Sequence, residues 1–452
     1  MRRLLPLALL ALTAAVLPAG ADPLHLPTDA SGWATPNVTP TAHIATAGAG
    51  VSGAFLDSKT FLLSVADEVW NETNAPATLT GGLQIFDTTD IKHPVMKGML
   101  PLPHFQNEDL SVSPKRQLAI ISQDSFGTPG RLNVIDVSNP AQPMLVGLLN
   151  YPSGYGHTAS LVGNDNYLWV SGGDDVLVID LHDPAAPSVA GTFATLAGAK
   201  GPGGSSGVHD AEADQFGDVS VYGSGGTAVY RVSANPLKPT LVASIAPVDN
   251  TPARNGLIHH GGKRLDSETW LLTEEDYSPG CDADGSLQVW KIDRLARRLR
   301  FVSMWDAPKD ADADRGALEQ TSYCSSHWFS INSSKIVADG WYGAGVRFLD
   351  LSNPRKPRPV GIWAGDSTTA SQAIFAPGHP DVVYVPDYVR GLDVISIKNA
   401  GKKARTVTDK DTSRVGTSTV PGLAFTVKLV PSKKWGWSCL VPELPGEAAH
   451  AH

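Results

Sequence analysis

Leu132-Asn133-Val134-Ile135-Asp136 and Val176-Leu177-Val178-Ile179-Asp180 are the clearest copies of a motif that recurs along this chain of 452 residues. Each copy is a short, mostly apolar run that ends in an aspartate and is followed by a turn containing proline. Five further copies end at Asp87, Arg231, Lys291, Asp350 and Ser396. The intervals between the seven motif ends are 49, 44, 51, 60, 59 and 46 residues. A repeat of this length is typical of a β-propeller, in which each blade holds four strands.

The two ends of the repeat region indicate how such a propeller would close. The last repeat stops after its third strand, near Ile397, so it lacks an outer strand. Residues 42–47 follow a turn at Pro40-Thr41, and we expect them to supply that strand, which removes a free sheet edge. The sequence therefore predicts an all-β fold, a seven-bladed β-propeller closed by an N-terminal strand. The expected boundaries are an extension over residues 22–41, the propeller over 42–398 and an irregular C-terminal tail over 399–452.

The four strands that end at Asp87, Asp136, Asp180 and Asp350 resemble the LVIVD repeat. Over residues 42–398 the chain is similar to the LVIVD-repeat family of secreted and cell-surface bacterial proteins. This resemblance implies a β-propeller in an extracellular setting. It implies no reaction, because the family is defined by its repeat rather than by an activity.

The first residues predict a secretory signal peptide. Arg2 and Arg3 precede an apolar run over residues 4–17 and the segment Pro18-Ala19-Gly20-Ala21, so we expect cleavage after Ala21. The apolar run is too short to span a bilayer, and no later segment reaches the required length. The sequence thus predicts a protein without a transmembrane segment that is secreted, periplasmic or attached to the cell surface.

The net charge narrows the range of partners. The chain carries a formal charge of −9 at pH 7, and removing the two arginines of the leader makes this about −11. An acidic surface of this kind argues against nucleic acid as a partner, because phosphate backbones are bound by basic surfaces. We expect an envelope or extracellular partner, whose identity the sequence does not indicate.

Four histidines share one position in the repeat. His157, His209 and His327 precede their motif ends by 23, 22 and 23 residues. His260 precedes its motif end by 31 residues, and an inserted loop over residues 277–284 accounts for the difference. This position lies where a loop enters the innermost strand, which in a propeller is the rim of the central channel. Blades three to six should each direct one imidazole toward the axis. The equivalent places in blades two and seven hold Glu108, Asp109, Ser371 and Gln372.

Acidic residues end most of the second strands, on the same face of the propeller: Asp67-Glu68, Asp124, Asp174-Asp175, Glu274-Glu275-Asp276, Asp339 and Asp387. Imidazoles beside carboxylates are the ligand set of divalent transition metal ions such as Zn, Cu, Fe or Mn. The candidate metal ligands are His157, His209, His260, His327, Glu274 and Glu275. The alternative is structural: such side chains can bond backbone groups of the next blade.

The cysteines predict one disulfide bond. Cys281 and Cys324 lie in loops on the same face of adjacent blades, and a bond between them suits an exported protein. Cys439 is left over in the tail, either free or available for an intermolecular bond.

The sequence alone is compatible with two functions. The first is an extracellular binding module that contacts its partner through the loop-rich face of the propeller and carries a candidate cation site at the channel mouth. The second is a metal-dependent extracellular enzyme, an oxidase or a hydrolase, that uses the histidines and acids of the rim. No catalytic residue is assigned, and a divalent or transition metal ion is the one cofactor expected.

Overall fold

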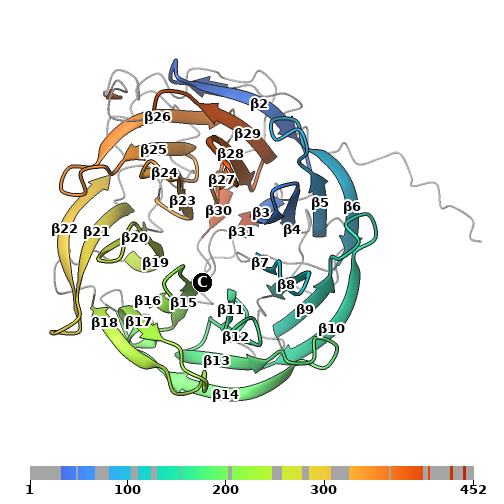
Figure 1. Cartoon of the computed structure of the whole chain (residues 1–452), viewed down its shortest axis with the longest axis vertical. Coiled ribbons are helices and arrows are strands. Elements are labelled where there is room, and N and C mark those ends of the chain that lie inside the picture. The colour runs from blue at the N-terminus through green and yellow to red at the C-terminus, as the bar shows by residue number, and fades with distance from the viewer. Residues whose placement is uncertain are drawn as a thin grey trace, which may run out of the picture.

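Antiparallel strands stand around a central axis as the blades of a propeller (Figure 1). The computed structural model describes residues 32–46, 49–66, 81–102, 110–123, 130–152, 154–201, 206–246, 257–276, 285–306, 325–365, 368–400, 406–407, 428–430 and 441–443. In these segments the chain forms strands and one short 3-10 helix, η1 (Leu196–Gly198). None of the helical structure in these segments is long and apolar enough to cross a membrane. The predicted all-β propeller is confirmed.

Each blade is built from an innermost strand near the axis outward to an edge strand (Figure 1). The innermost strands are β3 (Ala49–Asp57), β7 (Leu110–Ser113), β11 (Ala159–Val162), β15 (Val208–Ala213), β19 (Leu257–Arg264), β23 (Phe329–Ile331) and β27 (Ile374–Ala376). The second strands are β4 (Thr60–Ala66), β8 (Leu118–Gln123), β12 (Tyr167–Val170), β16 (Asp218–Gly223), β20 (Thr269–Asp276), β24 (Ile336–Gly340) and β28 (His379–Asp387).

The motif strands are the third strands: β5 (Gly82–Asp87), β9 (Gly130–Asp136), β13 (Asp175–Asp180), β17 (Gly226–Arg231), β21 (Ser286–Asp293), β25 (Val346–Asp350) and β29 (Gly391–Ile397). The outer strands are β6 (Val95–Pro101), β10 (Met144–Tyr151), β14 (Ser188–Ala194), β18 (Thr240–Ile245), β22 (Arg298–Asp306), β26 (Arg358–Gly365) and β2 (Val38–Ile44). Within the described segments these strands make seven units of four, numbered here as blades one to seven in chain order. Blades four and five join into one eight-stranded sheet through a single parallel pair, Ser244 with Arg298.

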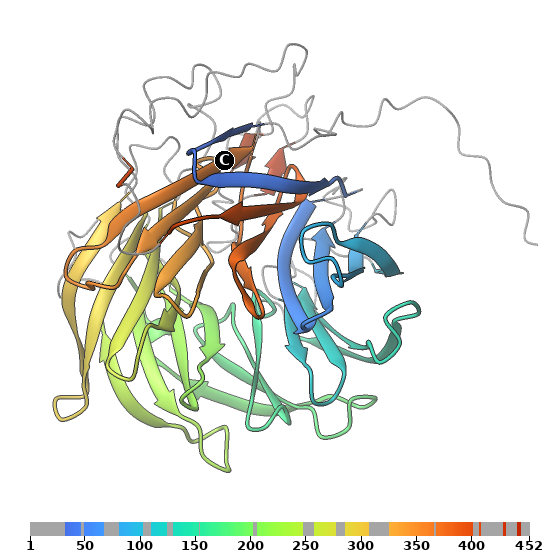
Figure 2. The same cartoon turned by 45° about the horizontal axis from the view of Figure 1, so that its top comes forward.

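The N-terminal strand closes blade seven, as predicted. β2 pairs antiparallel with β29, from Val38 opposite Ile397 to Ile44 opposite Leu392, and Figure 2 shows it lying along that blade. The strand starts earlier than expected, because Pro40 and Thr41 lie within it at a β-bulge rather than in a turn. A proline is tolerated there because β2 is an edge strand, where one backbone N–H group can be lacking.

Two further pairings were not predicted. β1 (Gly32–Ala34) adds a fifth strand to blade six by pairing with β26. In the tail, β30 (Lys428–Val430) pairs with β31 (Val441–Glu443).

Hydrophobic layers between neighbouring blades form the core. Leu132 and Val134 of β9 pack with Leu177 of β13, between blades two and three. Ile135 packs instead with Ile85 of β5, between blades one and two. Successive side chains of a strand point to opposite faces, so one strand contributes to both layers. This is why the motif strands are apolar on both faces.

The aspartate that ends the motif caps the turn that follows. Asp136 Oδ1 accepts a hydrogen bond of 2.8 Å from the backbone N–H of Ser138, and Asp350 Oδ1 accepts one of 2.9 Å from Ser352. Asp87 and Asp180 make the same contact two residues along. A short carboxylate side chain suits this turn because it can bond its own backbone two residues on.

The proline of the turn contacts the preceding blade. A Cβ atom on Gly98 of β6 would lie 2.1 Å from the carbonyl oxygen of Pro140, and one on Gly147 of β10 would lie 2.0 Å from that of Pro184. In blade five the matching residue is Ser303, whose hydroxyl donates a 2.6 Å hydrogen bond to the carbonyl oxygen of Pro354. The motif therefore sets the spacing between blades through its turn as well as through its strand.

Candidate metal centre

Two β-bulges direct histidines toward the propeller axis. In β15 the pairing with β16 skips one residue between Val208 and Asp210, and the skipped residue is His209. In β19 the pairing with β20 skips between His259 and Gly261, and the skipped residue is His260. A bulge re-aims the side chain of its extra residue and is common next to functional sites.

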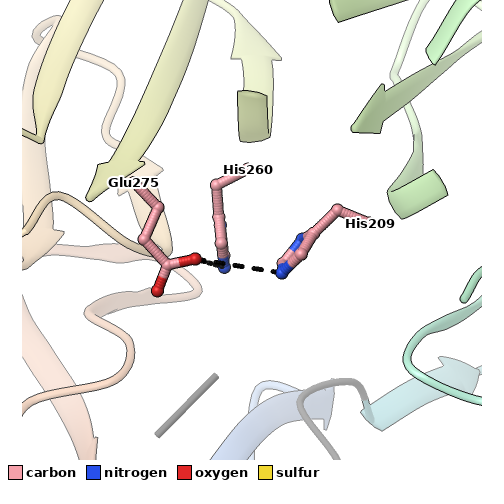
Figure 3. Close-up of side chains that lie close together, drawn as sticks. All are labelled: His209, His260 and Glu275. Carbon is pink, nitrogen blue, oxygen red and sulfur yellow. Dashed lines mark ion pairs between the residues drawn. The ribbon is translucent and has the colours of Figure 1, made fainter. Parts of the chain in front are cut away.

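Glu275 joins these histidines from the second strand of blade five. Its Oε2 atom lies 3.9 Å from His209 Nε2 and 3.8 Å from His260 Nε2 (Figure 3). The ligand atoms of the three residues all lie within 4.8 Å of one another, and the three side chains are fully buried. We call His209, His260 and Glu275 the axial triad.

A tyrosine holds the other oxygen of Glu275. The hydroxyl group of Tyr342 donates a 2.6 Å hydrogen bond to Glu275 Oε1. Tyr342 lies in the turn after β24 with a φ of 41°, in the left-handed region that residues other than glycine seldom adopt. Tyr342 was not predicted from the sequence, because this tyrosine belongs to neither the histidine series nor the acid series. Its contact with Glu275 spans 67 residues.

The other two predicted histidines flank the axial triad. His157 Nε2 lies 3.0 Å from His209 Nε2, and the His327 ring is 4.0 Å from the His260 ring, centroid to centroid. The ring of His209 lies 4.3 Å from that of His260, so the four imidazoles form one continuous arc. The structure thus brings together the four histidines that share a position in the repeat.

The contacts of His327 agree with the structural alternative, in which a rim side chain bonds a backbone group of the next blade. Its Nδ1 atom bonds the backbone carbonyl oxygen of Ser371 in blade seven, which is the contact with the next blade that this alternative anticipates. Trp328 packs beside it, 4.9 Å from the His327 ring and 5.7 Å from the His260 ring.

Glu274 lies outside the axial triad. It accepts hydrogen bonds from Ser286 Oγ at 3.1 Å and from Gln288 Nε2 at 2.8 Å. Side chains alternate along β20, so Glu274 and Glu275 face opposite sides of the sheet. The neighbouring histidines differ in the same way, because His259 Nδ1 contacts Thr227 Oγ1 at 2.8 Å.

Two buried carboxyl groups near the arc were not among the candidate ligands. Asp210 accepts a 3.2 Å hydrogen bond from Trp328 Nε1, and burial, with the charge of Glu212, raises the pKa of Asp210 to about 7. Asp339 accepts a 2.7 Å hydrogen bond from Ser326 Oγ, and burial raises its pKa to about 8.

Several predicted residues lie outside the described segments: the disulfide pair Cys281 and Cys324, then Cys439, Glu108 and Asp109, and the signal peptide over residues 1–21. They stay predictions.

The donor set of the axial triad suits a divalent transition metal ion. Two imidazole nitrogens and one carboxylate oxygen bind Zn²⁺ at roughly 2.0–2.2 Å, which separates tetrahedral ligand atoms by about 3.4 Å. The nitrogen–oxygen distances of 3.8 and 3.9 Å exceed this value by about half an ångström or less, and all three ligand atoms lie within 4.8 Å of one another, so binding an ion requires the side chains to move closer together. Three protein ligands leave one position of a four-coordinate ion for a further donor, either a ligand from solution, as in catalytic sites, or His157, whose Nε2 lies 3.0 Å from His209 Nε2.

Comparison with known proteins supports the repeat and the fold. The LVIVD repeat model matches residues 128–150 and 155–195, which cover the end of blade two and blade three. No curated protein sequence matches the chain.

Solved structures with a similar fold include a protein from Lactobacillus plantarum, with 11% identity and a TM-score of 0.56 over 77% of this chain and 95% of that chain. The periplasmic gluconolactonase of Pseudomonas aeruginosa has 16% identity and a TM-score of 0.53 over 77% and 95% of the two chains. The WD40 β-propeller domain of Doa1 has 7% identity and a TM-score of 0.52 over 81% and 99%. At these identities the likeness concerns the fold alone.

Proposed function

Because this chain is a β-propeller that contains LVIVD repeats, we propose that it is an exported metalloprotein whose metal ion is bound on the propeller axis by His209, His260 and Glu275. One observation carries this proposal: three buried side chains from two blades bring their ligand atoms within 4.8 Å of one another. Burying a carboxylate is costly unless it is paired or binds a metal. An ion at this place would compensate the cost for Glu275.

The proposed centre is catalytic in type. A metal ion with three protein ligands can polarise a substrate oxygen or activate a bound water molecule in its free position. This favours the metal-dependent enzyme among the two predicted functions, and it is compatible with either hydrolase or oxidase chemistry. When bound, the ion would supply the Lewis acid, and His209, His260 and Glu275 would hold it on the propeller axis.

Elemental analysis of the purified protein tests the proposal. We expect one equivalent of a transition metal, and a chelator should lower the melting temperature. Glu275→Gln should abolish binding while Glu274→Gln, one residue away on the opposite face, should retain it. His260→Ala should likewise lose the metal, and His182→Ala, at an exposed turn, should keep it. Wild-type protein without stoichiometric metal, and with melting unchanged by chelator, would refute the proposal.

Binding of an extracellular partner is a second candidate. The loop-rich face on which this prediction depended lies largely outside the described segments. The outer strands of blades one to three offer a different surface, because they expose apolar side chains: Val95, Met96, Met99, Met144, Leu145, Leu148 and Val189. Exposed apolar patches mark interaction sites when they are contiguous.

Capture from envelope extracts tests this second function. Replacing Met96, Met144 and Leu148 together with serine should reduce capture of whatever component the wild type retains. Leu295→Ser provides the control, because Leu295 is fully exposed in blade five. Equal capture by the triple variant and the wild type would count against the outer strands as the contact.

A further inference from the structure

The backbone of Tyr342 is held firmly at the axis. Its N–H and C=O groups both bond Ala370 of blade seven, each at 3.0 Å. Its carbonyl oxygen also accepts a hydrogen bond of 2.9 Å from Gly345, which closes the turn. A left-handed backbone is unfavourable for a residue other than glycine, and it persists where the surroundings determine it. Tyr342 is kept in that conformation by contacts with another blade.

The ring of Tyr342 is equally constrained. It packs 4.5 Å from the ring of His327 and 6.3 Å from that of Tyr388, centroid to centroid. The side chain is 1% exposed. The hydroxyl group therefore has a fixed place, and at that place it donates to Glu275 Oε1.

Because of this hydrogen bond, the two carboxylate oxygens of Glu275 have different partners. Oε1 faces Tyr342. Oε2 faces His209 and His260 (Figure 3). A carboxylate that binds a metal through both oxygens takes up two coordination positions, whereas one bound through a single oxygen takes up one. Hydrogen bonds to ligating carboxylates set their orientation and tune the metal.

We propose that Tyr342 is a positioning residue that restricts Glu275 to one metal–oxygen bond and thereby keeps a coordination position open for a small oxygen- or nitrogen-donor ligand from solution. This inference rests on the proposed metal centre. Tyr342 acts only through Glu275 and is not itself a ligand. Blade seven holds Tyr342 of blade six, and Tyr342 holds Glu275 of blade five.

Cobalt(II) spectroscopy of the full-length protein tests the proposal. The visible absorption of Co(II) is strong in four-coordinate sites and weakens as the coordination number rises. With saturating CoCl₂, wild-type protein and Tyr342→Phe should bind the same amount of metal. The variant should show several-fold weaker absorption, because the freed Oε1 also binds. Azide, used as the added ligand, should bind the variant at least tenfold more weakly than the wild type.

Tyr384→Phe is the matched control. The variant also loses a partly buried hydrogen bond, from the Tyr384 hydroxyl group to the carbonyl oxygen of Ile91, but Tyr384 lies in a core cluster apart from the axial triad. It should keep the wild-type spectrum and azide affinity. If Tyr342→Phe fails to fold, the wild-type spectrum alone tests the proposal: weak Co(II) absorption typical of five or six ligands would overturn the restriction of Glu275 to one metal–oxygen bond.

The outcomes separate the two proposals. Wild-type protein that binds no Co(II) overturns the metal centre and this inference with it. Equal Co(II) binding with an unchanged spectrum and unchanged azide affinity in Tyr342→Phe overturns the positioning role alone. Loss of all Co(II) binding in Tyr342→Phe also overturns it, because a residue that only orients Glu275 leaves the three ligands in place.

Discussion

Asp339→Asn should remove a pH dependence from the stability of the metal-free protein. Asp339 lies in β24, fully buried, and burial raises the pKa of its carboxyl group from 3.8 to about 8. The folded protein thus binds this proton up to about pH 8, whereas the unfolded chain releases it near pH 4. Between these values the folded state binds more protons than the unfolded state, so its stability falls as the pH rises.

The size of the effect follows from the two pKa values. They differ by about four units, and each unit corresponds to 1.36 kcal/mol, which gives a loss on the order of 5 kcal/mol between pH 4 and pH 8. Asparagine cannot ionise and keeps an acceptor for Ser326 Oγ. Its buried amide N–H groups bring a cost of their own, so the informative quantity is the change with pH rather than the absolute stability.

The pH dependence of the free energy of unfolding is measured by urea unfolding at several pH values between 4.5 and 9. Tryptophan fluorescence follows the unfolding, and a chelator is present throughout. The free energy of unfolding of Asp339→Asn minus that of the wild type should rise by about 1.4 kcal/mol per pH unit across the window. Ser326→Ala is the control: it removes the 2.7 Å hydrogen bond to Asp339 but leaves the titrating group, so its pH dependence should persist. Parallel curves for wild type and Asp339→Asn would refute the assignment.

Three further predictions concern the blades, the closure and the metal. Gly147→Ala should lower the free energy of unfolding by about 1–3 kcal/mol, because its Cβ atom would lie 2.0 Å from the Pro184 carbonyl oxygen; an unchanged urea midpoint would contradict that contact. Deleting the chain through Thr46 removes β2 and exposes the edge of β29, so we expect a lower melting temperature and concentration-dependent association in sedimentation. A monodisperse product that melts like the full chain would argue against this closure. Added Zn(II) at 100 times its Kd should stabilise the wild type by about 2.7 kcal/mol and leave Glu275→Gln unchanged in a thermal shift assay; equal shifts would place the metal elsewhere.

The sequence was sufficient to predict the propeller because its determinants are local. Asp136 and Asp350 cap turns through contacts only two residues away, and the apolar pattern of strands such as β9 follows from burial on both faces. The same regularity revealed the position shared by His157, His209, His260 and His327. Gly98 and Gly147 escaped notice because their constraint comes from the next blade.

Which of the rim residues form the axial triad was not readable from the sequence. The repeat position selected His260 rather than the adjacent His259, but a residue pattern alone does not show which of Glu274 and Glu275 faces the axis. The β-bulge at His260 and the register of β20 decide this.

The sequence by itself thus determined an all-β propeller, the closure by an N-terminal strand and the place where histidines gather. Only the tertiary structure decided that His209, His260 and Glu275 meet within 4.8 Å, and that Tyr342 restrains the carboxylate. The physical reason is the separation along the chain of the residues that interact. Strand pattern and turn capping depend on neighbours along the chain, whereas a binding centre depends on bulges and blade packing that align side chains from different repeats.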